Sequence, residues 1–304
     1  MKVVLVAAAA MAAGCAQDKR VKVPALDLSY LDTAVSPAVD FYEYATGGWQ
    51  KSHPLKPEYA RFGAFDALNE LNENRLNDLF KELSSMSAAK GTDEQKISDI
   101  YKMGLDSTRL QKEGFSPVAP YVQKIYLAKD KAELTKLIAE LHNYGESPFF
   151  GTFVMSDLRN SANQILYVGQ GGLGIGDRDY YTEAANAKIK EGYRKFLSRI
   201  FTLAGLSDPD KRADNALSVE DQLAVNSWTS VQERDMEKLS NPMSSAEFEA
   251  MCPGFDFKSY FSVRGIPEQD VLNVNEPSFF KAFGIYFNDA PLEVLQDYVA
   301  GQLI

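Results

Sequence analysis

A glycine-rich stretch in the middle of the chain constrains most strongly what this sequence can fold into. Five glycines lie within residues 169–176, directly after an apolar run, and the stretch ends in Asp177-Arg-Asp-Tyr-Tyr181. Gly169, Gly171 and Gly174 fit the pattern Gly-x-Gly-x-x-Gly, which binds a dinucleotide pyrophosphate where it joins a strand to the N-terminus of a helix. A nucleotide site is therefore the first hypothesis.

The residues around this stretch argue against a nucleotide. Two apolar segments within Phe149–Val168 flank the turn-prone Arg159-Asn-Ser-Ala-Asn163, which predicts an antiparallel β-hairpin. A dinucleotide site requires instead a parallel strand and a helix that begins within the glycines. We therefore interpret the stretch as a tight structural loop, in which Asp177, Arg178 and Asp179 bind neighbouring helices, and keep nucleotide binding as the alternative.

The rest of the chain has the patterns of α-helices. Apolar residues recur at helical spacing, and Thr92 and Asp130 are predicted to cap the N-termini of two helices. A short aromatic helix is predicted to follow Asp40 and to stop at Gly47-Gly48, and Val271–Val274 is a candidate short strand. The predicted fold class is mainly α, a lobe of many helices with a small β-hairpin.

Composition and histidine content exclude several classes of function. The chain has a net charge of -10 over its 304 residues, whereas nucleic-acid binding needs clustered Lys and Arg, so no nucleic-acid partner is expected. The only histidines, His53 and His142, are far apart and have no second ligand at helical spacing. We predict no metal site and interpret both as surface or capping residues.

No set of catalytic residues is apparent either. No Ser-His-Asp or Cys-His arrangement can be assembled from so few histidines, and the many carboxylates are predicted to lie on solvated helix faces. Cys252 is interpreted as a small buried hydrophobic residue. The sequence therefore predicts no catalytic residue in this chain.

The N-terminus is predicted to direct export. Lys2 precedes an apolar run that is too short for a transmembrane helix, which is typical of a signal peptide over residues 1–14. Ala12-Ala13-Gly14-Cys15 resembles a bacterial lipoprotein processing site. A lipid on Cys15 would anchor the mature protein to a membrane outside the cytoplasm, in the periplasm or at the cell surface, with residues 15–36 as a tether. Ordinary secretion is the alternative.

Several motifs along the chain occur together, and in the same order, in a single protein family. They are Asp40-Phe-Tyr-Glu-Tyr-Ala-Thr-Gly-Gly-Trp49, Arg61-Phe-Gly-Ala-Phe-Asp66, Gly169-Gln-Gly-Gly-Leu-Gly-Ile-Gly-Asp-Arg-Asp-Tyr-Tyr181, Glu220-Asp-Gln-Leu-Ala224 with Glu233-Arg-Asp235, and Asn275-Glu-Pro-Ser-Phe-Phe280 with Pro291-Leu-Glu293. Over about residues 37–304 the chain resembles the N-terminal half of the neprilysin family of zinc metalloendopeptidases. Thr46 stands where animal members have a disulfide cysteine, as expected of a bacterial member, and Gly176 replaces a common proline.

The resemblance implies a cap lobe that encloses a cavity for small peptides, with zinc bound by a separate C-terminal catalytic domain. The His-Glu-x-x-His motif of that domain would lie beyond Ile304. The chain is therefore expected to be the substrate-enclosing portion of a zinc-dependent metalloendopeptidase that hydrolyses small peptides, and to be inactive without the missing domain. The alternative is a lipid-anchored, non-catalytic peptide-binding or interaction module.

The resemblance also implies three substrate-binding residues. Arg61 matches an arginine that meets the C-terminal side of the substrate, and Phe65 and Asp66 match residues that line the adjoining pockets. A guanidinium suits this role because it pairs with a carboxylate through two hydrogen bonds. Asn69 stands where the family has a second arginine, which weakens selection for a C-terminal carboxylate. The alternatives are a helix-entry Arg61 that is solvated or paired with Glu58, and a Phe65 that belongs to the core.

Overall fold

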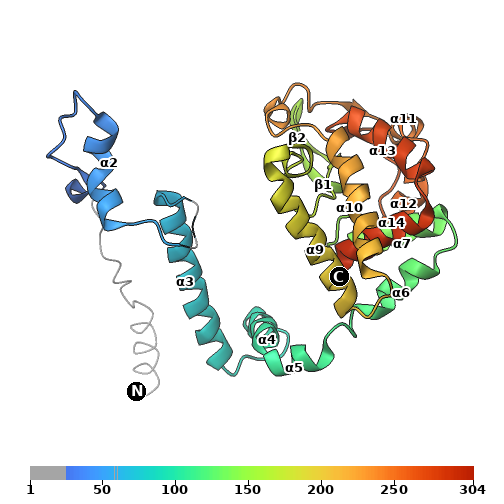
Figure 1. The fold of residues 1–304 in the computed structure, drawn as a ribbon, viewed down its shortest axis with the longest axis horizontal. Helices are drawn as coiled ribbons and strands as arrows, with labels where there is room; N and C mark the ends of the chain where they lie inside the picture. Colours follow the sequence, from blue (N-terminus) through green and yellow to red (C-terminus); the bar gives the residue numbers. More distant parts are fainter. Residues whose placement is uncertain (1–24, 58, 60) are drawn as a thin grey trace, which may run out of the picture. The chain divides into compact units, whose positions relative to one another are not determined.

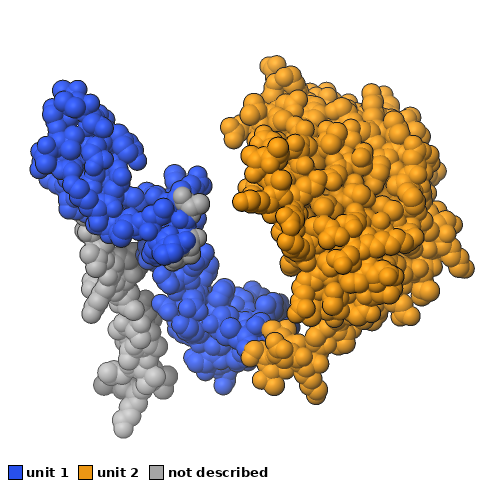
Figure 2. Space-filling model, in the orientation of Figure 1, with its two compact units in different colours: residues 1–106 blue, residues 107–304 orange. Residues whose placement is uncertain are grey.

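The computed structural model describes residues 25–57, 59 and 61–304. The predicted signal peptide, Cys15 and the beginning of the predicted tether lie outside these residues, as does Glu58. The chain divides into two compact units, residues 1–106 (unit 1) and residues 107–304 (unit 2), which are coloured separately in Figure 2. Among the described residues, no helix is both long and apolar enough to cross a bilayer.

Unit 1 is helical throughout its regular elements (Figure 1). These are η1 Leu28–Tyr30, α2 Phe41–Ser52, α3 Ala64–Ser85 and α4 Asp93–Leu105. Helices α3 and α4 pack against each other, with the rings of Phe80 and Tyr101 5.5 Å apart. Thr92 caps α4 as predicted, because its side chain accepts a hydrogen bond from the backbone N–H of Gln95.

Helix α2 continues through the two glycines at which it was predicted to stop. A Cβ atom on Gly48 would lie 2.3 Å from the carbonyl oxygen of Ser29, and one on Gly47 would lie 2.9 Å from the Cβ of Asp32. The glycines therefore let the segment before α2 pack closely against the helix, and they do not terminate it. The helix ends at Ser52, and His53 is its C-cap, as the capping interpretation of this histidine predicts.

Unit 2 combines helices with a small sheet (Figure 1). Its helices are α5 Ser107–Glu113, α6 Ala119–Leu127, α7 Lys131–Asn143, α8 Asp179–Thr182, η2 Ala184–Asn186, α9 Ala187–Leu203, α10 Pro209–Asn226, η3 Gln232–Arg234, α11 Ser245–Met251, α12 Phe257–Arg264, α13 Pro277–Asp289 and α14 Leu292–Leu303. Its strands are β1 Phe150–Asp157, β2 Asn160–Gln170, β3 Pro242–Met243 and β4 Leu272–Val274. Helix α10 packs against both α9 and α14. The prediction of a mainly α fold with a hairpin is confirmed.

The predicted hairpin is present, with two differences. Strands β1 and β2 are antiparallel, but the chain turns at residues 158–159 and β2 continues to Gln170, within the glycine stretch. Strand β2 also pairs in parallel with the predicted strand at 271–274, observed as β4, so the strand order is β1-β2-β4-β3. The full length of β2 was not predicted, because the residues at its N-terminal end are mostly polar and are exposed.

The core of unit 2 is built largely from phenylalanine rings. Phe150 is fully buried and lies 5.3–5.9 Å, between ring centroids, from four other phenylalanines, at positions 255, 257, 280 and 283. Aromatic pairs at such distances add to the free energy of burial. Cys252 is fully buried as predicted, and burial raises the pKa of its thiol to about 12, so it is held as an unreactive thiol.

The glycine stretch is a packed corner. Gly172 has φ +81°, and a Cβ there would lie 2.3 Å from the Oη of Tyr298 and 2.5 Å from the backbone nitrogen of Phe149. A Cβ on Gly174 would lie 1.9 Å from the Oη of Tyr193. Tyrosine hydroxyls therefore occupy the space that side chains would need, which supports the interpretation as a structural loop.

The three charged residues that follow the glycines have different roles from one another. Arg178 donates from Nε to the carbonyl oxygen of Ala224, 3.1 Å away at the end of α10, as predicted. Asp177 instead accepts the backbone N–H of Asp179 within the same turn, at 3.0 Å. The expectation that both acids bind neighbouring helices is therefore wrong for Asp177, which shapes the turn itself. Asp179 is the first residue of α8, and its backbone N–H is the donor to Asp177.

Glu220 is the polar centre of this corner, and it contradicts the prediction that carboxylates lie on solvated faces. Its side chain is fully buried and accepts hydrogen bonds from Gly174 N–H at 3.0 Å, Tyr193 Oη at 2.7 Å and Gln302 Nε2 at 3.0 Å, and from Tyr181 Oη. Burial raises its pKa, and the four donors oppose that rise. The donors come from segments distant in sequence, so no local pattern could reveal them.

His142 is also buried, so its interpretation as a surface residue is wrong. It lies in the last turn of α7, with its Nδ1 2.7 Å from Tyr260 Oη and its Nε2 3.0 Å from the carbonyl oxygen of Pro148. Burial lowers its pKa to about 4, so the ring is neutral at pH 7. Two tertiary partners, one of them on α12, give this histidine a structural role.

Candidate substrate-binding surface

The three residues expected to bind substrate come together in unit 1, where α3 begins. Arg61, Phe65 and Asp66 line one depression of about 250 Å³ together with residues 62–64. The chain passes from an extended segment into the helix at this point, since Gly63 is the N-cap and has extended backbone angles. The arginine thus precedes the first turn, whereas the phenylalanine and the aspartate belong to it.

Asp66 sets the position of the helix start. Its Oδ2 accepts the backbone N–H of Gly63 at 2.8 Å, as a carboxylate does in the third position of a helix. A negative charge in the first turn is also favoured by the helix dipole. The aspartate that ends the motif Arg-Phe-Gly-Ala-Phe-Asp therefore has a local structural role, because it fixes the helical turn that carries Phe65.

The two other side chains of this motif face solvent. Phe65 is 85% exposed, so the alternative that it belongs to the core is wrong. Arg61 is exposed, and no ion pair involves it among the described residues. An exposed ring beside an exposed guanidinium can receive an apolar side chain and a carboxylate of a ligand.

An aromatic groove of about 400 Å³ adjoins the depression and shares residues 62–64 with it. Trp49 lies in it, with its ring stacked on His53 at 4.5 Å and on Phe62 at 6.1 Å between centroids. Tyr30 and Tyr42 complete its aromatic lining. Tyr42, on α2, is 69% exposed.

An ion pair attaches the segment before α3 to that helix. Lys56 Nζ lies 2.5 Å from Glu70 Oε1, and Tyr59 Oη donates to the same oxygen at 2.9 Å. Hydrogen bonds from Lys56 and Tyr59 lower the pKa of the Glu70 carboxyl. Lys56 also lies 5.7 Å from the ring centroid of Phe62, in the range of a cation–π contact. This arrangement orients the aromatic wall between groove and depression.

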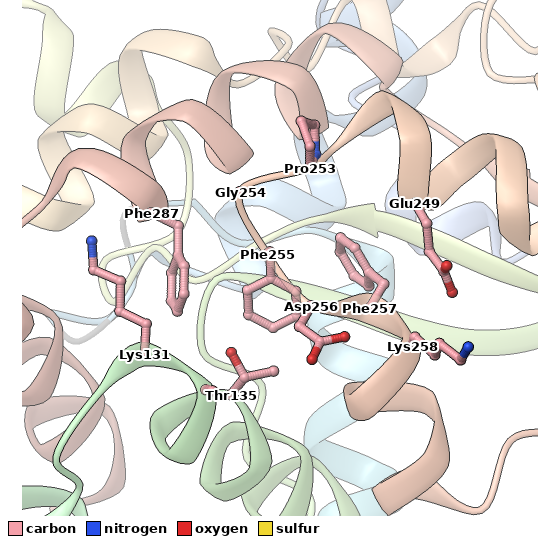
Figure 3. Close-up of a pocket in the computed structure, with 11 residues that line it drawn as sticks. Lys131, Thr135, Glu249, Pro253, Gly254, Phe255, Asp256, Phe257, Lys258 and Phe287 are labelled. Atoms are coloured by element: carbon pink, nitrogen blue, oxygen red, sulfur yellow. The ribbon is translucent and has the colours of Figure 1, made fainter.

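Unit 2 has a cavity of about 370 Å³ between α7, α13 and the loop before α12 (Figure 3). In Figure 3, Lys131 and Thr135 extend from α7 toward Phe287 and the ring of Phe255. Two of its four charged side chains are bound within the protein: Lys131 donates to the carbonyl oxygen of Asn288, and Asp256 caps α12 through the N–H of Ser259. This cavity is therefore a gap at the margin of the phenylalanine core.

A zinc site has no residues to hold it in the part of the chain that the structure describes. There, no three His, Cys, Asp or Glu side chains are grouped as metal ligands would be. His53 stacks on Trp49 and His142 bonds to Tyr260, so both histidines have other partners. No catalytic step through zinc is assigned to these residues.

Comparison with known proteins identifies the family. The sequence model of peptidase family M13 matches residues 37–304, through its N-terminal region. The chain belongs to peptidase family M13. The resemblance to the neprilysin family is thereby confirmed, since the match covers the motifs from Asp40 to Glu293.

Relatives within the M13 family are considerably longer than this chain. Endothelin-converting enzyme 1 of Rattus norvegicus is 27% identical over 305 residues, which cover 95% of this chain and 40% of that protein, and the enzyme of Homo sapiens is 26% identical. The chain therefore spans about 40% of the length of these curated relatives.

Solved structures agree with the M13 assignment. The zinc metalloprotease ZMP1 of Mycobacterium tuberculosis, in complex with an inhibitor, superposes with a TM-score of 0.84 at 27% identity, over 91% of this chain and 43% of that one. PepO from Lactobacillus rhamnosis HN001 has the same fold, with a TM-score of 0.69 at 18% identity over 87% of this chain and 42% of that one. The chain is thus the N-terminal part of an M13 peptidase fold. The roles of Arg61, Phe65 and Asp66 stay predictions.

Proposed function

We propose that this chain is the substrate-enclosing portion of a zinc-dependent endopeptidase that hydrolyses small peptides. The M13 match over residues 37–304 supports a part in such an enzyme, and similar proteins are described as a zinc metalloprotease and as endothelin-converting enzymes. The observation that carries the substrate role is the depression at the start of α3, where Arg61 and Phe65 are both exposed. Hydrolysis and zinc belong to residues outside this chain.

In this proposal each site residue has a separate task. The guanidinium of Arg61 pairs with an oxygen on the C-terminal side of the peptide, and Phe65 contacts the neighbouring apolar side chain. Asp66 acts through the backbone, because its bond to Gly63 N–H holds the first turn of α3 in place. Asn69 supplies no second positive charge, so the site discriminates only weakly between a free carboxylate and an amide at the peptide C-terminus.

Arg61→Ala tests the proposal, with Arg75→Ala as the matched control, because Arg75 is also exposed on α3. The probe is a fluorescein-labelled pentapeptide with leucine as its C-terminal residue, followed by anisotropy with the purified chain. Loss of a charged hydrogen bond should raise Kd about tenfold. In the complete M13 enzyme, the same change should raise KM more than it lowers kcat. Equal Kd values for Arg61→Ala and the unaltered chain would contradict the proposal.

The alternative of a non-catalytic peptide-binding module makes a different prediction for the intact gene product. Such a module binds the pentapeptide and never cleaves it, whereas the complete enzyme cleaves it and loses this activity with a zinc chelator.

We further propose that a lipid on Cys15 holds the protein outside the cytoplasm. Radiolabelled palmitate incorporated by the unaltered protein, and absent from Cys15→Ser, tests this; equal labelling of both would contradict it.

A further inference from the structure

The two edges of the sheet in unit 2 differ in a way that bears on binding. The strand order β1-β2-β4-β3 places β3 at one edge and β1 at the other. Strand β3 has two residues and begins with Pro242, which has no N–H to offer. Natural sheets protect their edges with short strands and proline. The β3 edge therefore has this protection.

The β1 edge has none of these protections. Strand β1 has eight residues, without proline, lysine or arginine, and its first charged residue is Asp157 at the turn. In an antiparallel pair, every second residue directs its N–H and C=O away from the partner strand. Among the described residues, no backbone group outside β2 pairs with residues 151–157. The C=O of Ser156 accepts a hydrogen bond from Tyr167 Oη at 2.9 Å. Apart from that carbonyl, the outer side of β1 is an open row of donors and acceptors.

The side chains along this edge are apolar and accessible. Phe153, Val154 and Met155 are 43%, 67% and 40% exposed, and they alternate between the two faces of the hairpin. The inner end is different: Phe150 is buried, and Thr152 Oγ1 lies 3.4 Å from Tyr260 Oη. The available edge is therefore residues 153–156.

We propose that this edge binds an extended basic peptide segment by adding it as a further strand beside β1. The backbone of another extended chain can hydrogen-bond to the unpaired N–H and C=O groups of an open strand edge. Alternate side chains of the added strand then contact the protein and give specificity. The net charge of -10 selects the occupant, because it disfavours a second copy of this chain and attracts a basic peptide. This site is independent of Arg61, so the two can fail separately.

The probe is a fluorescein-labelled, proline-free octapeptide of alternating valine and threonine with a lysine at each end. Val154→Lys places a charge on the edge without removing a backbone hydrogen bond, and Val225→Lys is the matched control, since Val225 is 63% exposed on α10. We expect Val154→Lys to raise Kd at least tenfold, whereas Val225→Lys leaves it unchanged. N-methylation of the peptide's alternate amides should also abolish binding, because it removes the donors.

Hydrogen exchange of β2 in the Val154→Lys variant verifies that the hairpin remains paired. Equal Kd values for Val154→Lys and Val225→Lys would overturn the proposal, as would unchanged binding of the N-methylated peptide. A dimer that forms without peptide, and that Val154→Lys dissociates in sedimentation velocity, would assign the edge to a second copy and overturn the peptide as its occupant.

Discussion

At the scale of single residues, Gly172 shows why the glycine stretch tolerates so few side chains. Its φ of +81° costs a side chain about 1–2 kcal/mol, and the Tyr298 hydroxyl occupies the Cβ position. That hydroxyl also donates to the carbonyl oxygen of Gly172 at 2.8 Å and accepts the N–H of Phe149 at 2.9 Å. A methyl group here would displace a tyrosine that joins the corner to the hairpin.

Gly172→Ala should therefore lower the free energy of unfolding of unit 2 by about 3 kcal/mol or more, the sum of the backbone and overpacking costs. The control is Gly176→Ala. Its φ of +87° is similar, but the position of its Cβ is open, so only the backbone cost of about 1–2 kcal/mol applies. Urea denaturation followed by circular dichroism measures both. A loss no larger for Gly172→Ala than for Gly176→Ala would show that Tyr298 moves without cost.

Two buried groups have opposite effects on the free energy of unfolding as the pH falls. His142 has a pKa lowered by burial to about 4, and Glu276, 2% exposed, has a pKa raised by burial to about 7. As pH falls from 6.5 to 4, the unfolded state gains a proton at His142 that the folded state does not, which destabilises the fold. As pH rises from 4.5 to 7, the unfolded state loses a proton at Glu276 that the folded state keeps, which is also destabilising.

Between pH 4.5 and 6.5 these contributions largely cancel, and Glu276→Gln should expose the histidine effect. The amide oxygen still accepts the N–H of Gln170, the bond that Glu276 Oε2 makes at 2.8 Å. We expect this variant to lose up to about 3 kcal/mol of unfolding free energy between pH 6.5 and pH 4, from the His142 shift alone. Urea titrations at half-unit pH steps measure the slope. The prediction fails if variant and unaltered chain have the same slope.

At the scale of elements, the sequence predicted most reliably those features that a few neighbouring residues determine. The caps Thr92 and Asp130 begin α4 and α7 as expected, because each side chain bonds to an N–H three residues later. The end of α2 was predicted wrongly. Glycine is needed at position 48 because Ser29 packs closely there, and not because the helix stops at this residue. The burial of Glu220 and the aromatic groove likewise depend on tertiary partners.

The start of α3 gives an element-scale prediction. Asp66→Ala removes the carboxylate that accepts Gly63 N–H, which should cost α3 about 1 kcal/mol. Hydrogen exchange of the first-turn amides should accelerate, and pentapeptide binding should weaken because Phe65 loses its fixed turn. Asp78→Ala is the control, since Asp78 is exposed in the middle of the same helix. Asp66→Glu should restore protection, because glutamate in the third position makes the same bond. Unchanged exchange in Asp66→Ala would contradict the capping role.

At the scale of the whole molecule, burial is distributed unequally between the two units. Among the described residues of unit 1, only Gly47 and Ser98 are buried, whereas the aromatic and aliphatic core belongs entirely to unit 2. Four leucines on α3 remain 44–50% exposed, at positions 68, 71, 76 and 79. An amphipathic helix gains most of its stability by burying its apolar face. Unit 1 of this chain therefore lacks most of that contribution.

This inequality predicts two levels of stability in the isolated chain. Amides of α3 and α4 should exchange with solvent at far lower protection than those of α10 and α14, whose apolar side chains pack in the core. Mass spectrometry of deuterium uptake, resolved by peptide, measures both sets in one sample. We propose that further chain covers these leucines in a complete M13 enzyme, and we expect protection of α3 to be higher there. If α3 were as protected as α10 in the isolated chain, unit 1 would be stable on its own, and its exposed leucines would need another explanation.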